Sequence, residues 1–181
     1  MKLTLTTLCL FLSFCSLGQR VFPDDFRKGG IEVNSQLTDL SLYSLDSVQL
    51  NSSDLKNKVT LINYWFVGCR GCRQEEEFMK EITEYFSEED KVQFISITPS
   101  TSSEVKEYFQ KHGDFGFPVY PAGGFKQVKK TFNVKTFPHS QIVVDGTIVE
   151  NVGIPIARAE WKDWLIDEIK EELVKLEQLH Q

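Results

Sequence analysis

The nine residues from Val59 to Val67, Val-Thr-Leu-Ile-Asn-Tyr-Trp-Phe-Val, form an almost unbroken run of β-branched and aromatic side chains. Such a run is typical of a strand that is buried on both faces inside a parallel sheet. Gly68 and the segment Cys69-Arg70-Gly71-Cys72 follow it directly. Beyond the cysteines, apolar residues recur at helical spacing, at Phe78, Met79, Ile82, Tyr85 and Phe86. The sequence therefore predicts a central strand that passes straight into a helix, with two cysteines at the junction.

The rest of the chain alternates strand and helix patterns, which predicts an α/β fold. A hairpin is expected within residues 37–55, and further strands at 92–97, near 117–119, at 141–144 and at 147–149, the last two joined by Asp145-Gly146. Helices are expected at 103–111, capped by Ser102 or Ser103, at 125–131, and at 159–179, where the last helix closes the chain. The strand-helix-strand order implies parallel pairing. We therefore expect a central mixed sheet flanked by helices, with an N-terminal hairpin and an inserted strand-helix element.

The size and charge of the chain limit its class. With 181 residues, of which 41% are hydrophobic and 25% charged, it has the composition of one compact domain. Its formal net charge is −6, and no run of Lys or Arg is longer than the pair Lys129-Lys130. Because a phosphate backbone is held by a basic surface, the sequence argues against nucleic acid as a partner.

The first residues have the pattern of an export signal. Lys2 provides a positive start, Leu8–Phe14 an apolar stretch, and Ser16-Leu17-Gly18 a small-x-small site at which we expect cleavage after Gly18. A retained membrane anchor is disfavoured because the apolar stretch is shorter than the roughly 20 residues that span a bilayer. The expected parts are a signal peptide (1–18), an irregular leader (19–35) and one folded domain (36–181).

Loss of the signal also simplifies the cysteines. Of the four cysteines, Cys9 and Cys15 leave with the signal, so that Cys69 and Cys72 remain. A lipid anchor on Cys15 is disfavoured because Phe14 occupies a position that needs a small residue. An exported protein with a single close cysteine pair uses that pair chemically or as a staple for one turn.

The position of the two cysteines suggests a division of roles. Where a strand ends and a helix begins, unpaired N–H groups and the positive end of the helix dipole stabilise the Cys69 thiolate, the form that attacks disulfides. Cys72 lies one turn further on the same helix face and can attack a mixed disulfide formed at Cys69. Arg70 adds a positive charge that makes the couple more oxidising, whereas burial by the preceding aromatic residues acts in the opposite direction.

A Cys-x-x-Cys spacing also occurs in zinc sites and in structural staples. The chain has no second cysteine pair after residue 18, and His112, His139 and His180 are scattered without the spacing of a structural zinc site. We therefore expect no metal and no cofactor. A structural disulfide remains an open alternative.

The segment Asn63-Tyr64-Trp65-Phe66-Val67-Gly68-Cys69-Arg70-Gly71-Cys72 resembles the active-site segment of thioredoxin-like proteins, specifically the exported TlpA/ResA group. Trp65 matches the tryptophan four residues before the first cysteine, and Asn63 matches a position where ResA-like members often have asparagine. The resemblance extends over residues 36–181. It implies a thioredoxin-like fold and a thiol-disulfide oxidoreductase activity.

Glu75 lies three residues after Cys72, at the position of a glutamate that is thought to handle protons for the cysteine pair in ResA-like proteins. Helical spacing also places it on the face that carries both cysteines, where a partly buried carboxylate would serve as a general base for Cys72. The alternative is a solvated acid in the first helical turn, as expected for Glu76 and Glu77. The sequence leaves both roles open.

Thr136-Phe137-Pro138, followed by the strand at 141–144, resembles the cis-proline loop that faces the cysteines in this family. The resemblance implies a cis bond before Pro138, although X-Pro bonds are in general mostly trans. A cis bond in such a loop leaves backbone groups of the preceding residue free to pair with an extended substrate. His139 is expected to be an exposed loop histidine outside the site.

Three departures from the family pattern leave substrate preference and redox potential open: Arg70-Gly71 replaces Gly-Pro or Glu-Pro, Gly68 replaces a tryptophan, and Glu77 replaces a frequent proline. The resemblance implies a periplasmic protein that reduces disulfides of exported proteins and is recharged by a membrane-linked electron donor. The alternatives are a disulfide donor or isomerase with a more oxidising couple, and a non-enzymatic binding module with a structural disulfide.

Overall fold

The computed structural model describes residues 23–179. The expected signal peptide, residues 1–18, lies outside the described residues. Within residues 23–179, no helix combines the length and the apolar character that a membrane crossing requires.

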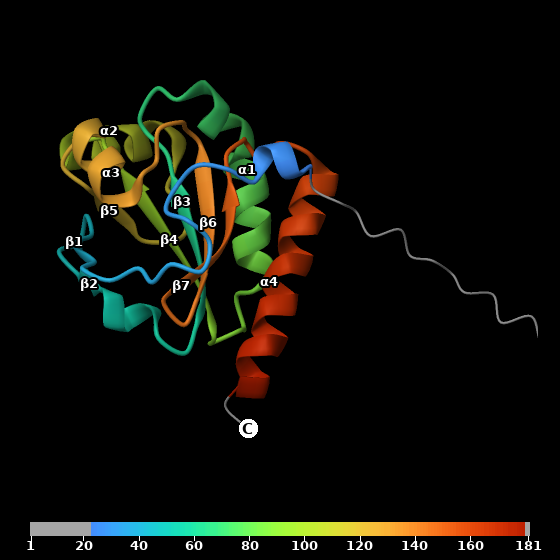
Figure 1. The fold of residues 1–181 in the computed structure, drawn as a ribbon. Helices are drawn as coiled ribbons and strands as arrows, with labels where there is room; N and C mark the ends of the chain where they lie inside the picture. The colour runs from blue at the N-terminus through green and yellow to red at the C-terminus, as the bar shows by residue number, and fades with distance from the viewer. Residues whose placement is uncertain (1–22, 180–181) are drawn as a thin grey trace, which may run out of the picture.

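A five-stranded mixed sheet with the order β5-β4-β3-β6-β7 forms the centre of the fold (Figure 1). Its strands are β3 (Val59–Tyr64), β4 (Val92–Thr98), β5 (Val119–Pro121), β6 (His139–Val144) and β7 (Thr147–Val152). β3 is the middle strand, parallel to β4 and antiparallel to β6, and all of its residues are buried. The expected central strand and its parallel pairing are therefore confirmed.

Helices cover both faces of this sheet. α1 (Arg70–Tyr85) and α4 (Ala159–Leu179) pack side by side on one face (Figure 1). α3 (Phe125–Phe132) packs on the opposite face, and α2 (Ser102–His112) packs near the first turn of α1. Since side chains alternate along a strand, Leu61 of β3 enters the core under α1 and α4, whereas Ile62 enters the other core.

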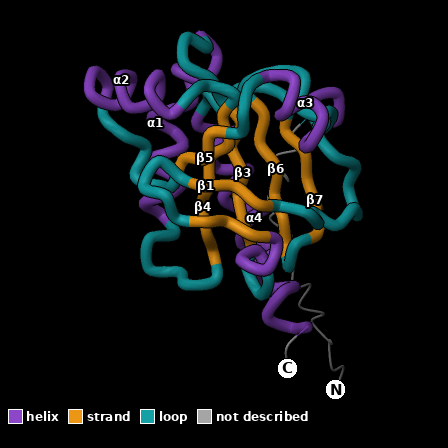
Figure 2. The backbone as a smooth tube through the Cα atoms, turned by 90° about the vertical axis from the view of Figure 1, so that its left-hand side faces the viewer, coloured by secondary structure: helices purple, strands orange, loops and turns teal. Residues whose placement is uncertain are grey.

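The expected N-terminal hairpin is present as a separate two-stranded sheet of β1 (Ser41–Tyr43) and β2 (Gln49–Asn51). Figure 2 looks onto the face of the main sheet that this hairpin covers, where Leu50 joins the same core as Ile62. A 3₁₀ helix, η2 (Ser52–Leu55), leads from the hairpin to β3. The inserted strand-helix element is β5 with α3, placed between α2 and β6.

Thr101 caps the N-terminus of α2. Its hydroxyl accepts a 3.3 Å hydrogen bond from the Glu104 amide, and the Glu104 carboxylate accepts a 2.7 Å bond from the Thr101 amide. This reciprocal pair satisfies two N–H groups at the helix start. The prediction that Ser102 or Ser103 caps the helix is wrong. The reciprocal hydrogen bonds need a hydroxyl three residues before Glu104, and Thr101 occupies that position.

The segment that precedes the hairpin runs along the open edge of β7. It begins with a 3₁₀ helix, η1 (Asp24–Phe26), and continues without regular secondary structure up to the isolated bridge between Gln36 and Thr147. Backbone N–H···O bonds join the segment to the sheet, from Gly153 to Phe26 (2.8 Å), Asn34 to Ile148 (2.8 Å) and Ile148 to Ser35 (2.9 Å). The segment therefore satisfies backbone groups that an uncovered edge strand would leave to solvent.

Candidate active site

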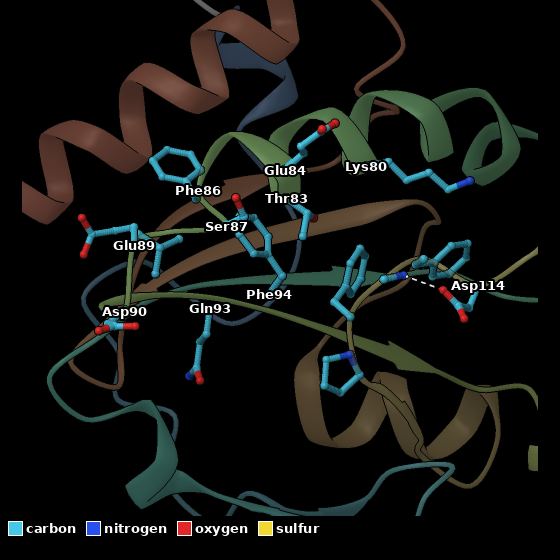
Figure 3. Close-up of a pocket in the computed structure, with 15 residues that line it drawn as sticks. Lys80, Thr83, Glu84, Phe86, Ser87, Glu89, Asp90, Gln93, Phe94 and Asp114 are labelled. Carbon is cyan, nitrogen blue, oxygen red and sulfur yellow. Dashed lines mark hydrogen bonds between the residues drawn. The ribbon is translucent and has the colours of Figure 1, made fainter.

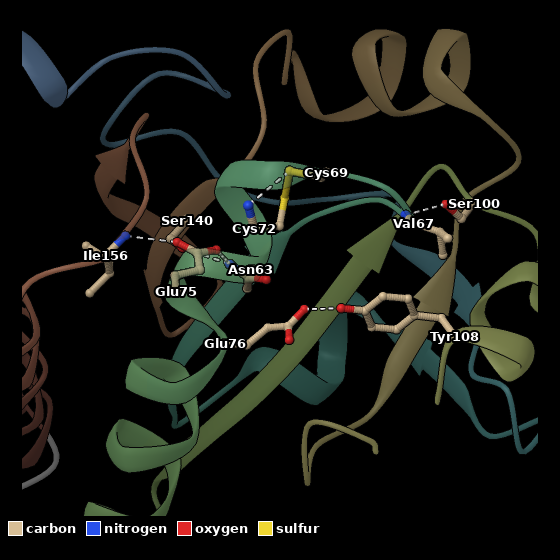
Figure 4. Close-up of a disulfide and its surroundings, with 10 residues drawn as sticks. All are labelled: Asn63, Val67, Cys69, Cys72, Glu75, Glu76, Ser100, Tyr108, Ser140 and Ile156. Carbon is tan, nitrogen blue, oxygen red and sulfur yellow. Dashed lines mark hydrogen bonds between the residues drawn. A yellow bond between two sulfur atoms is a disulfide. The ribbon is translucent and has the colours of Figure 1, made fainter. Parts of the chain in front are cut away.

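The two cysteines lie at the N-terminal end of α1, and an open groove lies at the other end of this helix (Figure 3). They form a disulfide, with 5.3 Å between their Cα atoms. Cys69 caps the helix, and its Sγ accepts a 3.1 Å hydrogen bond from the Cys72 amide (Figure 4). In the reduced protein, this amide and the helix dipole stabilise a thiolate at Cys69. The predicted junction of strand, cysteine pair and helix is confirmed.

Pro138 lies beside the cysteine loop, and its peptide bond to Phe137 is cis. The approach is close: a Cβ at Gly71 would lie 3.0 Å from Cδ of Pro138 and 3.2 Å from Cγ of Pro155. A larger residue at position 71 would therefore need one of these prolines to move. The loop that contains Pro138 and the loop that contains the cysteines thus share one surface.

Both cysteines are nearly buried, with exposed fractions of 4% for Cys69 and 3% for Cys72. The aromatic side chains of Trp65, Tyr108 and Phe115 pack in the same cluster. Gly68 has φ of 92°, and a Cβ placed there would meet nothing within 4 Å. The cysteine loop is therefore enclosed by aromatic rings and has open space beside Gly68.

Glu75 is buried, with 2% of its surface exposed, one helical turn after Cys72. Its Oε1 accepts a 2.8 Å bond from Asn63 Nδ2, and its Oε2 accepts a 2.9 Å bond from the Ile156 amide (Figure 4). Burial raises the pKa of Glu75 to about 7, although both hydrogen bonds act to lower it. The interpretation of Glu75 as a solvated acid is wrong, because its face of α1 packs against the sheet.

A small internal cavity connects Glu75 with Cys72. Its volume of about 10 Å³ is close to the space that one water molecule needs. The cavity is lined by Asn63, Trp65, Cys72, Glu75, Glu76, Met79, Phe115 and Phe117. Within the described residues, the buried indole nitrogen of Trp65 has no hydrogen-bond partner. The cavity therefore places a proton-accepting carboxylate and the second cysteine around one shared space.

Glu76 and Tyr108 form a contact that sequence reasoning missed. Glu76 is half-buried and accepts a hydrogen bond from the Tyr108 hydroxyl of α2 (Figure 4). Burial, together with this bond to Glu76, raises the pKa of Tyr108. The expectation that Glu76 is a solvated acid is therefore wrong, whereas Glu77 is exposed as expected. The two partners lie 32 residues apart, and no local pattern signals such a pair.

The expectation that His139 is an exposed loop residue is also wrong. His139 is the first residue of β6 and is 1% exposed, and its Nε2 lies 3.2 Å from Asn151 Oδ1. Burial lowers the pKa of His139 to about 4, partly offset by the bond to Asn151. The same Asn151 oxygen accepts a 2.9 Å bond from Gln141. His139 is thus a neutral member of a buried polar network on the outer side of the site.

No group of three or more His, Cys, Asp or Glu side chains within residues 23–179 is arranged to hold a metal ion.

Ser100 is a further residue of the site that sequence reasoning missed. Its Oγ accepts a 3.0 Å hydrogen bond from the Val67 amide. This bond fixes the chain between β3 and the first cysteine.

Comparisons with known proteins agree with this architecture. A family model described as thioredoxin-like matches residues 57–147, half of the chain. The thiol-disulfide oxidoreductase ResA of Bacillus cereus is 27% identical over 149 residues, which cover 82% of this chain and 83% of the relative. The thioredoxin-like protein YneN of Bacillus subtilis is 25% identical over 126 residues, or 69% of this chain and 73% of the relative.

Among solved structures, a candidate protein disulfide isomerase from Bacteroides thetaiotaomicron superposes with a TM-score of 0.70 at 18% identity. The match covers 84% of this chain and 97% of that structure. At this identity the likeness concerns the fold, and it confirms the thioredoxin-like arrangement expected from the sequence. The chain belongs to the thioredoxin-like family.

Proposed function

We propose that the protein is a thiol-disulfide oxidoreductase that reduces disulfides in exported proteins. The observation that carries this proposal is the Cys69–Cys72 disulfide at the helix N-terminus, with the Cys72 amide on Cys69 Sγ and cis-Pro138 against the same loop. The names of the ResA relatives, which are thiol-disulfide oxidoreductases, support the same chemistry.

The proposed reaction transfers two electrons from the protein to its substrate. The Cys69 thiolate attacks one sulfur of a substrate disulfide, and the other substrate sulfur leaves as a thiolate. Cys72 then attacks Cys69 Sγ in the mixed disulfide and releases the second substrate thiolate. The substrate gains two electrons, and the protein ends in the Cys69–Cys72 disulfide form that the structure describes.

Glu75 is proposed to take the proton of Cys72 as that thiol becomes a nucleophile. A carboxyl group with a pKa of about 7 holds and releases a proton near neutral pH, and both groups line the same water-sized cavity. In this role Glu75 assists the second step, in which Cys72 attacks the mixed disulfide. The first step, the attack by Cys69, depends instead on the N-terminal end of α1, which stabilises the Cys69 thiolate.

The cis-Pro138 loop is proposed to position an extended substrate segment beside the disulfide. Apolar surface adjoins it: the Phe137 ring contacts Phe66 and Phe125 edge to face, at centroid distances of 5.4 Å and 5.7 Å. Phe125 is 55% exposed, so its ring adds accessible apolar surface next to Phe137. We infer that the substrate cysteine is flanked by apolar residues.

Export, a periplasmic location and recharging by a membrane-linked electron donor belong to the same proposal, and they rest on the sequence pattern of residues 1–18 and on the family resemblance. The proposed division is a cleaved signal at 1–18, a leader at 19–35 and the redox domain at 36–181.

One observation favours a different function, a binding module whose disulfide is only structural. Both cysteines are nearly buried, at 4% and 3% exposure, which would suit a staple as well as a reactive pair. In such a module, Cys69→Ser would keep partner binding and lose only stability.

An equilibrium redox titration against glutathione and dithiothreitol buffers, with thiol trapping of Cys69 and Cys72, tests the proposal. A reversible two-electron couple at roughly −270 mV indicates a reductase, and one at roughly −120 mV indicates a disulfide donor. A pair that becomes reduced only when the protein unfolds would refute enzymatic function and leave the binding module.

A further inference from the structure

An open groove of about 740 Å³ lies between the C-terminal half of α1 and the segment 114–118 (Figure 3). Its floor includes β4, and its residues are Lys80, Thr83, Glu84, Phe86, Ser87, Glu89, Asp90, Val92, Gln93, Phe94, Asp114, Phe115, Gly116, Phe117 and Pro118. The volume is in the range of sites that bind ligands in proteins. The redox chemistry proposed above makes no use of this groove.

The groove lies beside an unpaired stretch of sheet edge, in which Val92 and Phe94 are each 8% exposed. β3 pairs with β4 from Val92 onward, whereas β5 on the other side pairs only with the part from Ser96 to Thr98. Within the described residues, no strand therefore pairs with positions 92–95 on their outer side. Pro118, which comes just before β5, has no N–H and cannot extend the ladder toward Phe94.

The backbone polar groups of Phe94 point toward this open side. In a parallel strand the N–H and C=O of one residue share a side, and the side alternates along the strand. The Ser96 amide donates to Pro118 O at 2.9 Å, whereas Ile97 O accepts from the Trp65 amide on the β3 side. Phe94, two residues before Ser96, therefore directs its N–H and C=O outward, where an added strand can pair with them.

Side chains around this edge combine aromatic surface with negative charge. Phe86, Phe94 and Phe117 line the groove, from the end of α1, from β4 and from the segment between α2 and β5. Four acidic residues and one lysine lie around them: Glu84, Glu89, Asp90, Asp114 and Lys80. The charge around the groove is therefore negative, and a complementary partner carries basic residues next to apolar ones.

We propose that this groove binds an extended polypeptide strand of a partner protein, in which Lys or Arg residues alternate with apolar residues. The strand pairs with the backbone of Phe94, places apolar side chains against the phenylalanines, and sets its basic residues near Glu84 and Asp90. Strand addition to an open sheet edge is a general mode of peptide recognition. The proposal goes beyond the redox function and does not depend on it.

The groove also adjoins the candidate active site. Phe115 and Phe117 line both the groove and the small cavity that contains Cys72 and Glu75. A strand bound in the groove therefore contacts the outer side of the same aromatic wall that encloses the resolving cysteine.

The test uses a peptide without cysteine, so that its result is independent of redox activity. The probe is acetyl-Lys-Phe-Lys-Val-Lys-Phe-Lys-amide, added to ¹⁵N-labelled protein while amide exchange is followed by NMR. Binding in the groove slows exchange of the Phe94 amide at least tenfold and shifts the resonance of Gly116. The same peptide with an N-methyl group on every residue has no backbone N–H to donate from either of its edges, and it leaves Phe94 exchange unchanged.

Charge reversals test the acidic rim. Glu84 and Asp90 are exposed, and neither side chain makes a hydrogen bond or ion pair within the described residues, so Glu84→Lys with Asp90→Lys leaves the fold intact. This pair weakens peptide binding at least tenfold. Asp46→Lys with Glu171→Lys changes the net charge equally at exposed sites outside the groove, and it changes binding less than threefold. Equal weakening by both pairs, or binding of the probe without an effect on Phe94, overturns the proposal.

Discussion

The Asn63 side chain of β3 donates a 2.8 Å hydrogen bond to the Glu75 carboxylate of α1, and both residues are buried. The partner of this buried acid is thus a neutral amide. Because no cation pairs with this carboxylate within the described residues, desolvation outweighs the hydrogen bonds and raises the pKa of Glu75 to about 7. The bond also fixes the carboxylate beside the cavity that Cys72 lines.

Glu75→Gln is expected to change the pH dependence of stability. The folded pKa of about 7 lies above the ordinary value of 4.5, so between these pH values the folded protein keeps a proton that the unfolded chain has lost. The contribution of Glu75 to the stability of the folded protein therefore falls as the pH rises, by about 3 kcal/mol in total. The variant lacks this fall. Urea unfolding of the oxidised proteins at pH 5 and pH 8 measures the difference.

Glu77→Gln provides the matched control, since Glu77 is exposed on the same helix turn. It should keep the pH dependence of the wild type. An unchanged pH profile in Glu75→Gln would show that the carboxyl group titrates normally and would remove the proton-handling role.

Serine substitutions separate the roles of the two cysteines. Reduced Cys72→Ser should form a stable mixed disulfide with thionitrobenzoate when it is mixed with the symmetrical disulfide reagent, because no thiol remains to resolve it. Cys69→Ser should react at least about tenfold more slowly, since its remaining thiol lacks the helix cap position. Mass spectrometry of the quenched mixtures measures both products. The reverse order of reactivity would assign the attack to Cys72.

Acid should destabilise the protein through His139. Its pKa of about 4 in the folded state lies below the ordinary value of 6.5, so between these pH values the unfolded chain binds a proton that the folded protein excludes. The contribution of His139 to stability is therefore complete above pH 6.5 and falls by about 3 kcal/mol as the pH decreases to 4, opposite in sign to the contribution of Glu75. Relative to the wild type, His139→Asn should lose about 3 kcal/mol less stability between pH 6.5 and pH 4 in urea unfolding, whereas His112→Asn, at an exposed position, should follow the wild type.

Gly30→Ala tests the packing of the N-terminal segment against the sheet. Gly30 has φ of 69°, and a Cβ there would lie 2.4 Å from Asn151 Oδ1 and 2.5 Å from Gln141 Nε2. We expect a loss of about 3 kcal/mol from backbone strain and this clash together. Gly123→Ala is the control, because Gly123 has φ of 75° but its nearest neighbour is at 3.9 Å. A loss of about 1 kcal/mol is expected there, and equal losses would mean that the clash contributes nothing.

Local patterns were sufficient to predict the elements of this fold. The apolar run from Val59 to Val67 reflects the burial of one strand, and the helical spacing after Cys72 reflects the burial of one helix face. Each pattern lies within a single element and is therefore visible in the sequence. The order of the strands across the sheet was not predicted, because local patterns do not say which strands are neighbours. The cap of α2 was predicted wrongly because Ser102 and Ser103 are equally good capping residues, and only the spacing to Glu104 distinguishes Thr101.

The site was predictable where its residues are close in sequence or share a family motif. Cys69, Cys72 and Pro138 are found where the sequence placed them. The burial of Glu75 could not be predicted, because it depends on the Ile156 amide, which lies 81 residues further along the chain. The burial of His139 depends in the same way on Asn151, which belongs to the next strand of the sheet.

The pairing of β3 with β6 determines which parts of the site are synthesised first and which last. Asn63 is paired with Ser140, 77 residues later in the chain. A ribosome therefore releases both cysteines well before it releases the strand and the cis-proline loop that complete their surroundings. Until β6 has been released, the two thiols belong to an unfinished chain, so the surroundings that enclose them can form only when synthesis has passed this strand.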